Sequence, residues 1–223
     1  HIVVCIDEFQ QIGEWADSLT IQKRMRSVWQ HQQHTSYCLF GSKKHLLANL
    51  FQNRRMPFYH FGDTIYLKPI PTSDWIPFIC EKFVEKGKKI SEELVSKICS
   101  TVASHSSYVQ QLAWNIMVNT ETEVTDEIFQ QSISELLAQC SPLFIQQIQG
   151  LTTYQMNLIR CLCQGVRKDF TSKDVLETYQ LGSKSNVSRL KKTLVEKEII
   201  EEEGDTITLA DPIFELWFKR EYM

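Results

Sequence analysis

The chain has 223 residues, of which 43% are hydrophobic and 23% are charged, and its formal net charge is −3. This composition is typical of a globular protein with room for two or three domains. The small negative charge excludes the strongly basic class of nucleic-acid-binding protein and gives no general attraction to an anionic membrane. The sequence contains no apolar run of membrane-spanning length, so we expect a cytoplasmic protein without a membrane partner.

Seven cysteines are spread along the chain, and most of them lie inside apolar runs. An odd number in such positions favours buried, reduced thiols over a disulfide framework. The cysteines are Cys5, Cys38, Cys80, Cys99, Cys140, Cys161 and Cys163.

The first ten residues contain an apolar run, Ile2–Ile6, that leads directly into Asp7 and Glu8. A continuous apolar run is typical of a strand buried on both faces of a parallel sheet. Ligands bind just beyond the carboxyl ends of such strands. At that position Asp7 can hold Mg²⁺ and Glu8 can polarise a water molecule. The alternative is a buried strand that ends in two solvated acids.

This stretch resembles the Walker B strand of P-loop NTPases, in the DE form used by AAA+ and STAND ATPases. Its Asp7–Gln10 ending, DEFQ, resembles one branch of STAND-type ATPases found in archaea and bacteria. The resemblance implies binding of ATP and Mg²⁺, with Asp7 at the metal and Glu8 orienting the attacking water. The P-loop pattern GxxxxGK[ST], which holds the phosphates, does not occur in these residues. We therefore expect the C-terminal portion of a longer ATPase, beginning in the middle of its sheet.

A second β-prone run, Thr35–Phe40, ends in Gly41-Ser42 and predicts a strand beside the first. In AAA+ proteins the adjacent strand ends in a polar residue, sensor 1, that contacts the attacking water or the γ-phosphate. The resemblance gives Ser42 that catalytic role. Alternatively, Ser42 caps the helix that we expect to start near Lys43.

The resembled ATPases next have a PFYG-like segment, often followed by an arginine, and this chain has Pro57–His60 and then Phe61. An arginine finger, which stabilises charge on the transferred phosphoryl group, would therefore be Arg54 or Arg55, or be absent. The alternative is that both arginines are simply solvated. Thr64–Leu67 then predicts a last core strand, and the prolines that follow it predict a domain boundary.

Residues 73–150 have a helical pattern. The expected helices start near Trp75, Ser91, His105 and Asp126. The third start resembles the lid motif of STAND ATPases, where a Pro-Tyr pair and the helix N-terminus contact the nucleotide, although Ser107 replaces the proline here. This resemblance makes Tyr108 a candidate for nucleotide binding, whereas the alternative is plain core packing.

From residue 151 three helical segments are followed by two short strands that meet at an acidic turn, Glu201–Asp205. Three helices and a hairpin form a winged helix. The segment that follows, Ala210–Phe218, resembles the DPxFxxW segment found after the winged helix in the same archaeal and bacterial ATPases.

The third helix of this domain, Ser183–Glu196, carries side chains suited to DNA. The candidates for DNA contact are Lys184, Asn186, Arg189 and Lys192. The acidic turn would repel a phosphate backbone, however, and DNA-binding domains are usually basic. In STAND ATPases the winged helix often packs on the nucleotide domain and reports its state. We therefore favour a protein contact over DNA binding.

Together these patterns predict an α/β region, a partial P-loop NTPase core, followed by an all-α lid and a winged-helix domain. The expected ranges are 1–70, 71–150 and 151–223. The resemblance implies a nucleotide-dependent conformational switch that acts on a protein partner, although this chain alone would be inactive as an ATPase. Two alternatives remain open: a DNA-binding regulator or initiator-like protein, because origin-recognition ATPases share this domain order, and an interaction module without catalysis.

Overall fold

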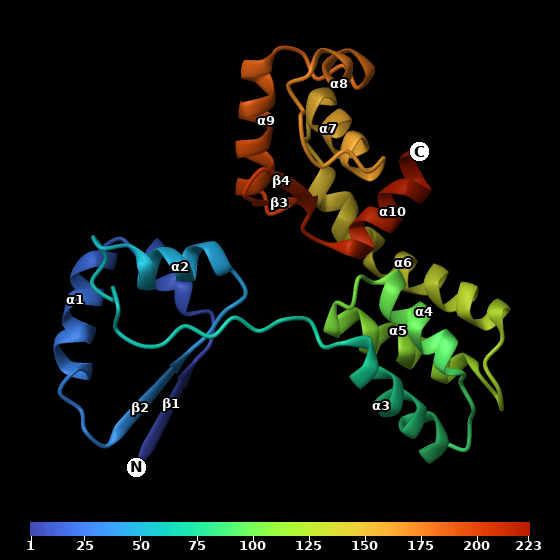
Figure 1. The fold of residues 1–223 in the computed structure, drawn as a ribbon, viewed down its shortest axis with the longest axis horizontal. Helices are drawn as coiled ribbons and strands as arrows, with labels where there is room; N and C mark the ends of the chain where they lie inside the picture. Colours follow the sequence, from blue (N-terminus) through green and yellow to red (C-terminus); the bar gives the residue numbers. More distant parts are fainter. The chain divides into compact units, whose positions relative to one another are not determined.

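A computed structural model describes the backbone of residues 1–223 and all side chains except those of Lys44 and His45. The chain divides into two compact units, residues 1–68 and residues 69–223 (Figure 1). The first is a small α/β unit and the second is almost entirely helical.

The first unit is built around two parallel strands. Its elements are β1 (Ile2–Ile6), the 3-10 helix η1 (Phe9–Glu14), α1 (Ser18–Trp29), β2 (Thr35–Leu39) and α2 (Lys44–Gln52). In the sheet Ile2 lies opposite Thr35, and Ile6 lies opposite Leu39. Parallel strands need a long crossover connection, and the segment that contains α1 provides it. Both strands are confirmed where the apolar runs predicted them.

Aromatic side chains form the core of this unit, and Phe58 is completely buried at its centre. The Phe58 ring packs edge-on against Phe9, with 5.3 Å between the ring centroids. The guanidinium of Arg26 in α1 donates hydrogen bonds to the carbonyl oxygens of Pro57 and of Tyr59, the second at 2.7 Å. The segment that contains Phe58 is thus fixed to α1 as well as to the core.

The expectation that β1 is buried on both faces is wrong for these residues. Ile2 and Val3 are both 62% exposed, and Cys5 and Cys38 are exposed too. The register places Val3, Cys5 and Cys38 on one face of the sheet, because side chains alternate along a strand. No described element covers that face.

The expectation of buried cysteines is therefore wrong for Cys5 and Cys38, whereas Cys99, Cys161 and Cys163 are buried. Burial raises the pKa of the Cys161 thiol to about 11 and that of Cys163 to about 12. All seven thiols are free, as expected.

The expected strand at Thr64–Leu67 is also wrong: in the described chain this segment is neither helix nor strand. Its apolar side chains point to solvent, with Ile65 81% and Leu67 85% exposed. A strand needs a neighbour to take its backbone hydrogen bonds. Within the described chain β1 and β2 pair only with each other, so this β-prone sequence has no strand beside it.

The second unit follows the predicted order of helices and hairpin. Its elements are α3 (Thr72–Glu85), α4 (Glu92–Thr101), α5 (Ser106–Asn119), α6 (Asp126–Ile148), α7 (Thr153–Cys163), α8 (Lys173–Thr178), α9 (Lys184–Glu196), β3 (Ile200–Glu203), β4 (Thr206–Leu209) and α10 (Pro212–Tyr222). Helix α3 begins earlier than expected, directly after Pro71, which takes the extended N-cap conformation. None of the described helices is long and apolar enough to cross a bilayer.

Most helix starts in this unit have a side-chain cap, and this explains why the sequence predicted them well. An N-cap oxygen satisfies a backbone N–H that has no partner within the helix. At α7 the cap is reciprocal, since Thr152 and Gln155 accept hydrogen bonds from each other's backbone N–H groups. The other capping side chains are Ser91, Thr125, Ser172, Ser183 and Asp211.

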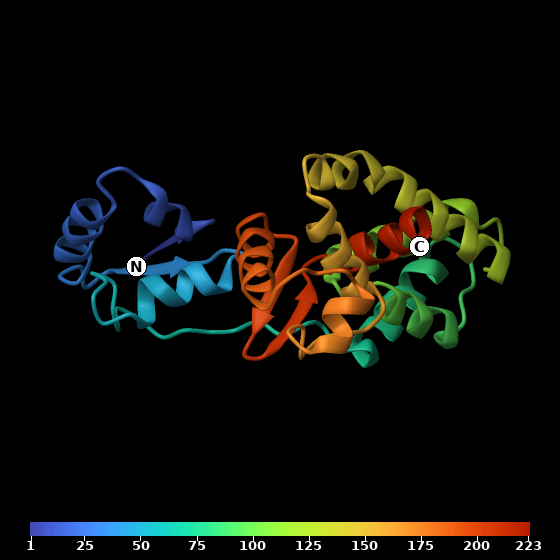
Figure 2. The same cartoon turned by 90° about the horizontal axis from the view of Figure 1, so that it is seen from above.

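The lid helices and the winged helix share one hydrophobic core that extends from Trp75 to Phe218. Helix α10 lies along α6 (Figure 2). The ring centroid of Phe144 in α6 is 5.4 Å from that of Phe214 and 5.4 Å from that of Trp217. The Trp217 indole nitrogen also donates to the Ser141 hydroxyl at 3.0 Å. The packing is thus continuous across residue 150.

Candidate functional site

The carboxyl ends of β1 and β2 are held together beyond the strands themselves. The backbone N–H of Phe40 donates to the carbonyl of Ile6 at 3.1 Å, and the N–H of Phe9 donates to the carbonyl of Phe40 at 3.0 Å. These bonds keep the two chain exits adjacent. Asp7 and Glu8 follow β1, and Ser42 follows β2, so the three side chains emerge at the same edge of the sheet.

Glu8 forms a sharp turn at the end of β1. Its backbone is left-handed, with φ 49° and ψ 40°, a conformation that costs free energy for a residue with a side chain. Successive side chains on a strand point to opposite faces, and this turn provides the bend that removes Asp7 and Glu8 from that alternation. The Asp7 Oδ1 atom accepts the Glu8 backbone N–H at 2.8 Å.

The structure brings Glu8 and Ser42 together. The Ser42 hydroxyl donates to the two carboxylate oxygens of Glu8, at 3.3 and 3.5 Å. The N-cap of α2 is Lys43, so Ser42 is not the cap residue that the alternative interpretation required. Gln10 also donates to Glu8, through Nε2 to Oε2. The residue pattern does not single out Gln10, although it is the last letter of the DEFQ ending.

Asp7 is exposed, and its Oδ2 atom has no protein partner in the described contacts. Among the described side chains there is no group of three or more His, Cys, Asp or Glu that could hold a metal ion. A single carboxylate nevertheless fits Mg²⁺ chemistry, because this ion is usually bound by one or two carboxylates together with water and substrate phosphates. The donor set is therefore compatible with Mg²⁺ that arrives with a nucleotide.

A cavity of about 760 Å³ lies beside Ser42 within the first unit. Its lining includes Gly41, Ser42, Arg26 and the segment from His60 to Leu67. This volume is in the range of small-molecule sites. Part of the lining is Thr64–Leu67, the segment that we expected to be a strand. Its apolar side chains Ile65 and Leu67 are exposed.

Arg54 and Arg55 lie in the exposed turn after α2. The backbone N–H of Arg55 donates to the Asn53 side chain at 3.0 Å, which shapes the turn. In the described contacts neither guanidinium has a hydrogen bond or ion pair, and neither arginine contacts Asp7, Glu8 or Ser42. Their role as an arginine finger stays a prediction.

Tyr108 lies in the second unit, near the start of α5. Its hydroxyl donates to Asp211 Oδ2 at 2.6 Å, while Asp211 Oδ1 accepts the backbone N–H groups of Ile213 and Phe214 at 2.7 and 3.0 Å. Burial, and then the bond to Asp211 and its charge, raise the pKa of Tyr108 far above its ordinary value. The hydroxyl therefore stays protonated and joins α5 to the cap of α10. A contact with nucleotide stays a prediction.

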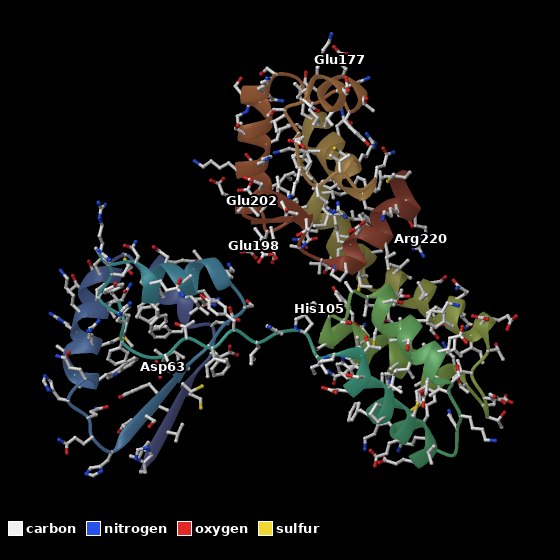
Figure 3. All side chains as sticks on the ribbon, viewed as in Figure 1. Asp63, His105, Glu177, Glu198, Glu202 and Arg220 are labelled. Carbon is white, nitrogen blue, oxygen red and sulfur yellow. The ribbon has the colours of Figure 1, made fainter. Side chains whose placement is uncertain are left out.

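The candidate DNA contacts lie on α9, and one of them is occupied within the protein. The Asn186 amide donates to the Leu181 carbonyl at 2.8 Å and accepts from Arg189 at 2.9 Å. Lys184, Arg189 and Lys192 are exposed, and Lys192 lies 3.9 Å from the Glu196 carboxylate. Acidic side chains of the hairpin region, including Glu198 and Glu202, project on the surface of the same unit (Figure 3).

A family described as a probable winged helix domain matches residues 142–220. The match starts inside α6 and ends inside α10. It includes the helices α7–α9, the β3–β4 hairpin and the aromatic contacts between α6 and α10. The prediction of a winged helix is confirmed, although the matched region begins upstream of residue 151.

The solved structures that resemble the chain include the two that follow. The Walker-type ATPase PABY2304 of Pyrococcus abyssi is 16% identical, with a TM-score of 0.73 over 97% of this chain and 63% of that one. The ORC1 protein of Aeropyrum pernix, solved in complex with DNA, is 15% identical, with a TM-score of 0.49 over 99% of this chain and 64% of that one. This chain thus spans less than two thirds of either protein. The comparison with curated proteins gives no match.

The first of these likenesses confirms the expected fold at a coarse level. At 16% identity it concerns the fold alone. Nucleotide binding and the roles of individual residues are not part of what it shows.

Proposed function

We propose that this chain is part of a P-loop ATPase of the STAND/AAA+ type that uses ATP binding and hydrolysis as a conformational switch. The observation that carries the proposal is the meeting of Asp7, Glu8 and Ser42 at the carboxyl ends of two parallel strands. Ligands bind at this edge of α/β sheets. The fold likeness to a Walker-type ATPase supports the same assignment.

Each side chain has a separate role in this proposal. Asp7 holds Mg²⁺ through its exposed carboxylate, and Mg²⁺ when bound neutralises charge on the phosphates. Glu8 accepts a hydrogen bond from the attacking water and orients it. Ser42 follows the neighbouring strand, and with nucleotide bound its hydroxyl proton would turn from Glu8 to a phosphate oxygen or to the same water. Arg54 or Arg55 serves as the arginine finger.

The second unit would carry the response to the nucleotide. Tyr108 is the proposed nucleotide contact, through its ring, because its hydroxyl is already bonded to Asp211. Asp211 caps α10, and α10 packs on α6. A shift at the start of α5 would therefore reach the winged helix through direct contacts. The same proposal includes a cytoplasmic protein partner, which would respond to this conformational change of the winged helix.

The 223 residues alone should not bind ATP tightly, because phosphate binding in this class needs the P-loop backbone and its lysine. We expect calorimetry with Mg·ATP to give no micromolar affinity. A protein of the same sequence with a GxxxxGK[ST] segment upstream is the comparison. Micromolar binding by the 223 residues would show that the nucleotide site has been misplaced.

DNA binding through α9 is the rival function, supported by the winged-helix match and by the exposed side chains of Lys184 and Arg189. The acidic hairpin and the occupied amide of Asn186 oppose it. We expect a fluorescent duplex, titrated at two salt concentrations, to show no saturable binding. A true DNA binder with several phosphate contacts would lose affinity by about 10³-fold or more between 50 and 200 mM salt.

A matched variant sharpens this titration. Changing Glu201, Glu202 and Glu203 together to Gln removes the charge of the hairpin and keeps its size. If this variant also fails to bind the duplex, the acidic hairpin is not what prevents DNA binding, and the rival function is overturned. Micromolar binding by the parent chain, with a steep salt dependence, would establish the rival function instead.

A further inference from the structure

Gln10 is a buried polar residue directly below the Glu8 turn, and it is only 2% exposed. Burying an amide is costly unless its hydrogen bonds are made. Its Nε2 atom donates to the Glu8 carboxylate. Its Oε1 atom is buried and has no partner among the described residues. The bond to Glu8 is thus the hydrogen bond that this buried amide makes in the described structure.

The space for this amide exists because residue 41 is glycine. A Cβ atom on Gly41 would lie 1.9 Å from Gln10 Oε1 and 2.9 Å from its Cδ atom. The φ angle of Gly41 is not in the left-handed region, so its backbone does not itself require glycine. Gly41 is needed here for room. It also lies between Phe40, whose backbone joins the two strand exits, and Ser42.

The Glu8 carboxylate therefore accepts hydrogen bonds from two side chains, those of Gln10 and Ser42. Gln10 Nε2 donates to Oε2, while the Ser42 hydroxyl donates to both oxygens at 3.3 and 3.5 Å. Hydrogen bonds to a carboxylate are stronger than those between neutral groups, so both donors act on the orientation of Glu8. Of the two donors, Gln10 is the buried one, and its position is fixed by packing against Gly41.

We propose that Gln10 is a positioning residue, which holds the Glu8 carboxylate in the orientation that acts on the attacking water, and that Gly41 provides the room for its amide. The inference rests on the proposed function, because it assigns Glu8 a water to orient. A catalytic group must be held in place by neighbours that are themselves locked by packing. The buried amide of Gln10 meets that requirement.

The first test is Gln10→Met in the ATPase that contains this chain. Met keeps the length and bulk of the side chain but removes the donor. We expect kcat to fall by about tenfold, because a misoriented group loses rate without losing substrate affinity, and KM for Mg·ATP to stay nearly constant.

Gln22→Met is the matched control. Gln22 is another buried glutamine in the same unit, its Nε2 donates to Ser18 at 2.7 Å, and its Oε1 also lacks a partner. It has no contact with Glu8 in the described structure. We expect this variant to keep its kcat. An equal fall of kcat in both variants would mean that the effect is only structural and would overturn the proposal.

A second variant displaces the amide without changing it. Gly41→Ala places a Cβ atom on the site of Gln10 Oε1 and should push the amide away from Glu8. We expect the same loss of kcat as for Gln10→Met. Gly13→Ala is its control, since a Cβ atom there would meet only Leu50 Cδ2, at an ordinary contact distance of 3.9 Å, and its φ is not left-handed. A Gly41→Ala protein with parent kcat and KM would contradict the assignment.

Glu8→Gln, measured in the same assay, separates this inference from the function beneath it. If Glu8→Gln keeps parent turnover, the ATPase assignment fails and the role of Gln10 fails with it. If Glu8→Gln loses turnover while Gln10→Met and Gly41→Ala do not, only the positioning role fails. In the 223 residues alone, Glu8→Gln should shift the side-chain amide resonance of Gln10 and leave that of Gln22 in place; an unmoved Gln10 resonance would also overturn the proposal.

Discussion

Replacing Glu8 with Gln in the ATPase that contains this chain is expected to reduce turnover by about 10²-fold or more and to leave the affinity for Mg·ATP nearly unchanged. Gln keeps the shape of the side chain and its hydrogen-bonding reach, but it loses the negative charge that draws a proton from water. Substrate binding depends on Asp7 and the phosphate contacts instead. Single-turnover hydrolysis, with binding measured separately, distinguishes the two effects.

Asp7→Asn is the companion variant, because it alters the neighbouring acid at the same turn. It should weaken binding of nucleotide in the presence of Mg²⁺, since the metal loses a carboxylate ligand. If Glu8→Gln hydrolyses ATP at the parent rate, Glu8 is a solvated acid and the catalytic assignment is lost. The chain would then be better described as an interaction module without catalysis.

The sequence was sufficient to predict the two strands whose ends carry the candidate site residues. Ile2–Ile6 and Thr35–Leu39 are apolar runs with polar endings, and the structure pairs them in parallel with both endings at one edge. Asp7, Glu8 and Ser42 follow from those endings. Local patterns of this kind are reliable because the hydrophobic run and the residue that ends it are adjacent in the chain.

The exposed segments could not be predicted in the same way. Thr64–Leu67 has the residue types of a strand, but strand formation depends on a neighbouring strand, and none in the described chain pairs with it. The exposure of one face of β1 could not be predicted for the same reason. An apolar run is buried only if another element covers it. Propensity describes the segment and not its surroundings.

The contacts that fix the site were also beyond sequence reasoning. Nothing in the residue pattern distinguishes Gln10, which is buried against Gly41, from an exposed glutamine in a turn. Likewise, Tyr108 and Asp211 belong to separate motifs 103 positions apart, and their hydrogen bond depends on the packing of α5 near α10. Contacts between distant segments need the tertiary fold.

Trp217→Ala is expected to lower the free energy of unfolding of the second unit by about 3–5 kcal/mol, the usual cost of removing a large buried aromatic side chain. Trp217 is 1% exposed, packs on Phe144 and Phe214, and donates to Ser141. Its removal leaves a cavity where α10 meets α6. Urea unfolding followed by far-UV circular dichroism measures the loss.

The helices that lose hydrogen-exchange protection in Trp217→Ala test whether the lid and the winged helix unfold as one body. Because a single core extends from α3 to α10, Trp217→Ala should expose amides of α5 and α9 to hydrogen exchange at the same urea concentration. Trp114→Ala, at a position that is 62% exposed on α5, should change stability by no more than about 0.5 kcal/mol. If α9 loses protection while α5 keeps it, the winged helix unfolds independently. A signal received near Tyr108 would then have no rigid path to α9, and the coupling between nucleotide and winged helix would need another contact.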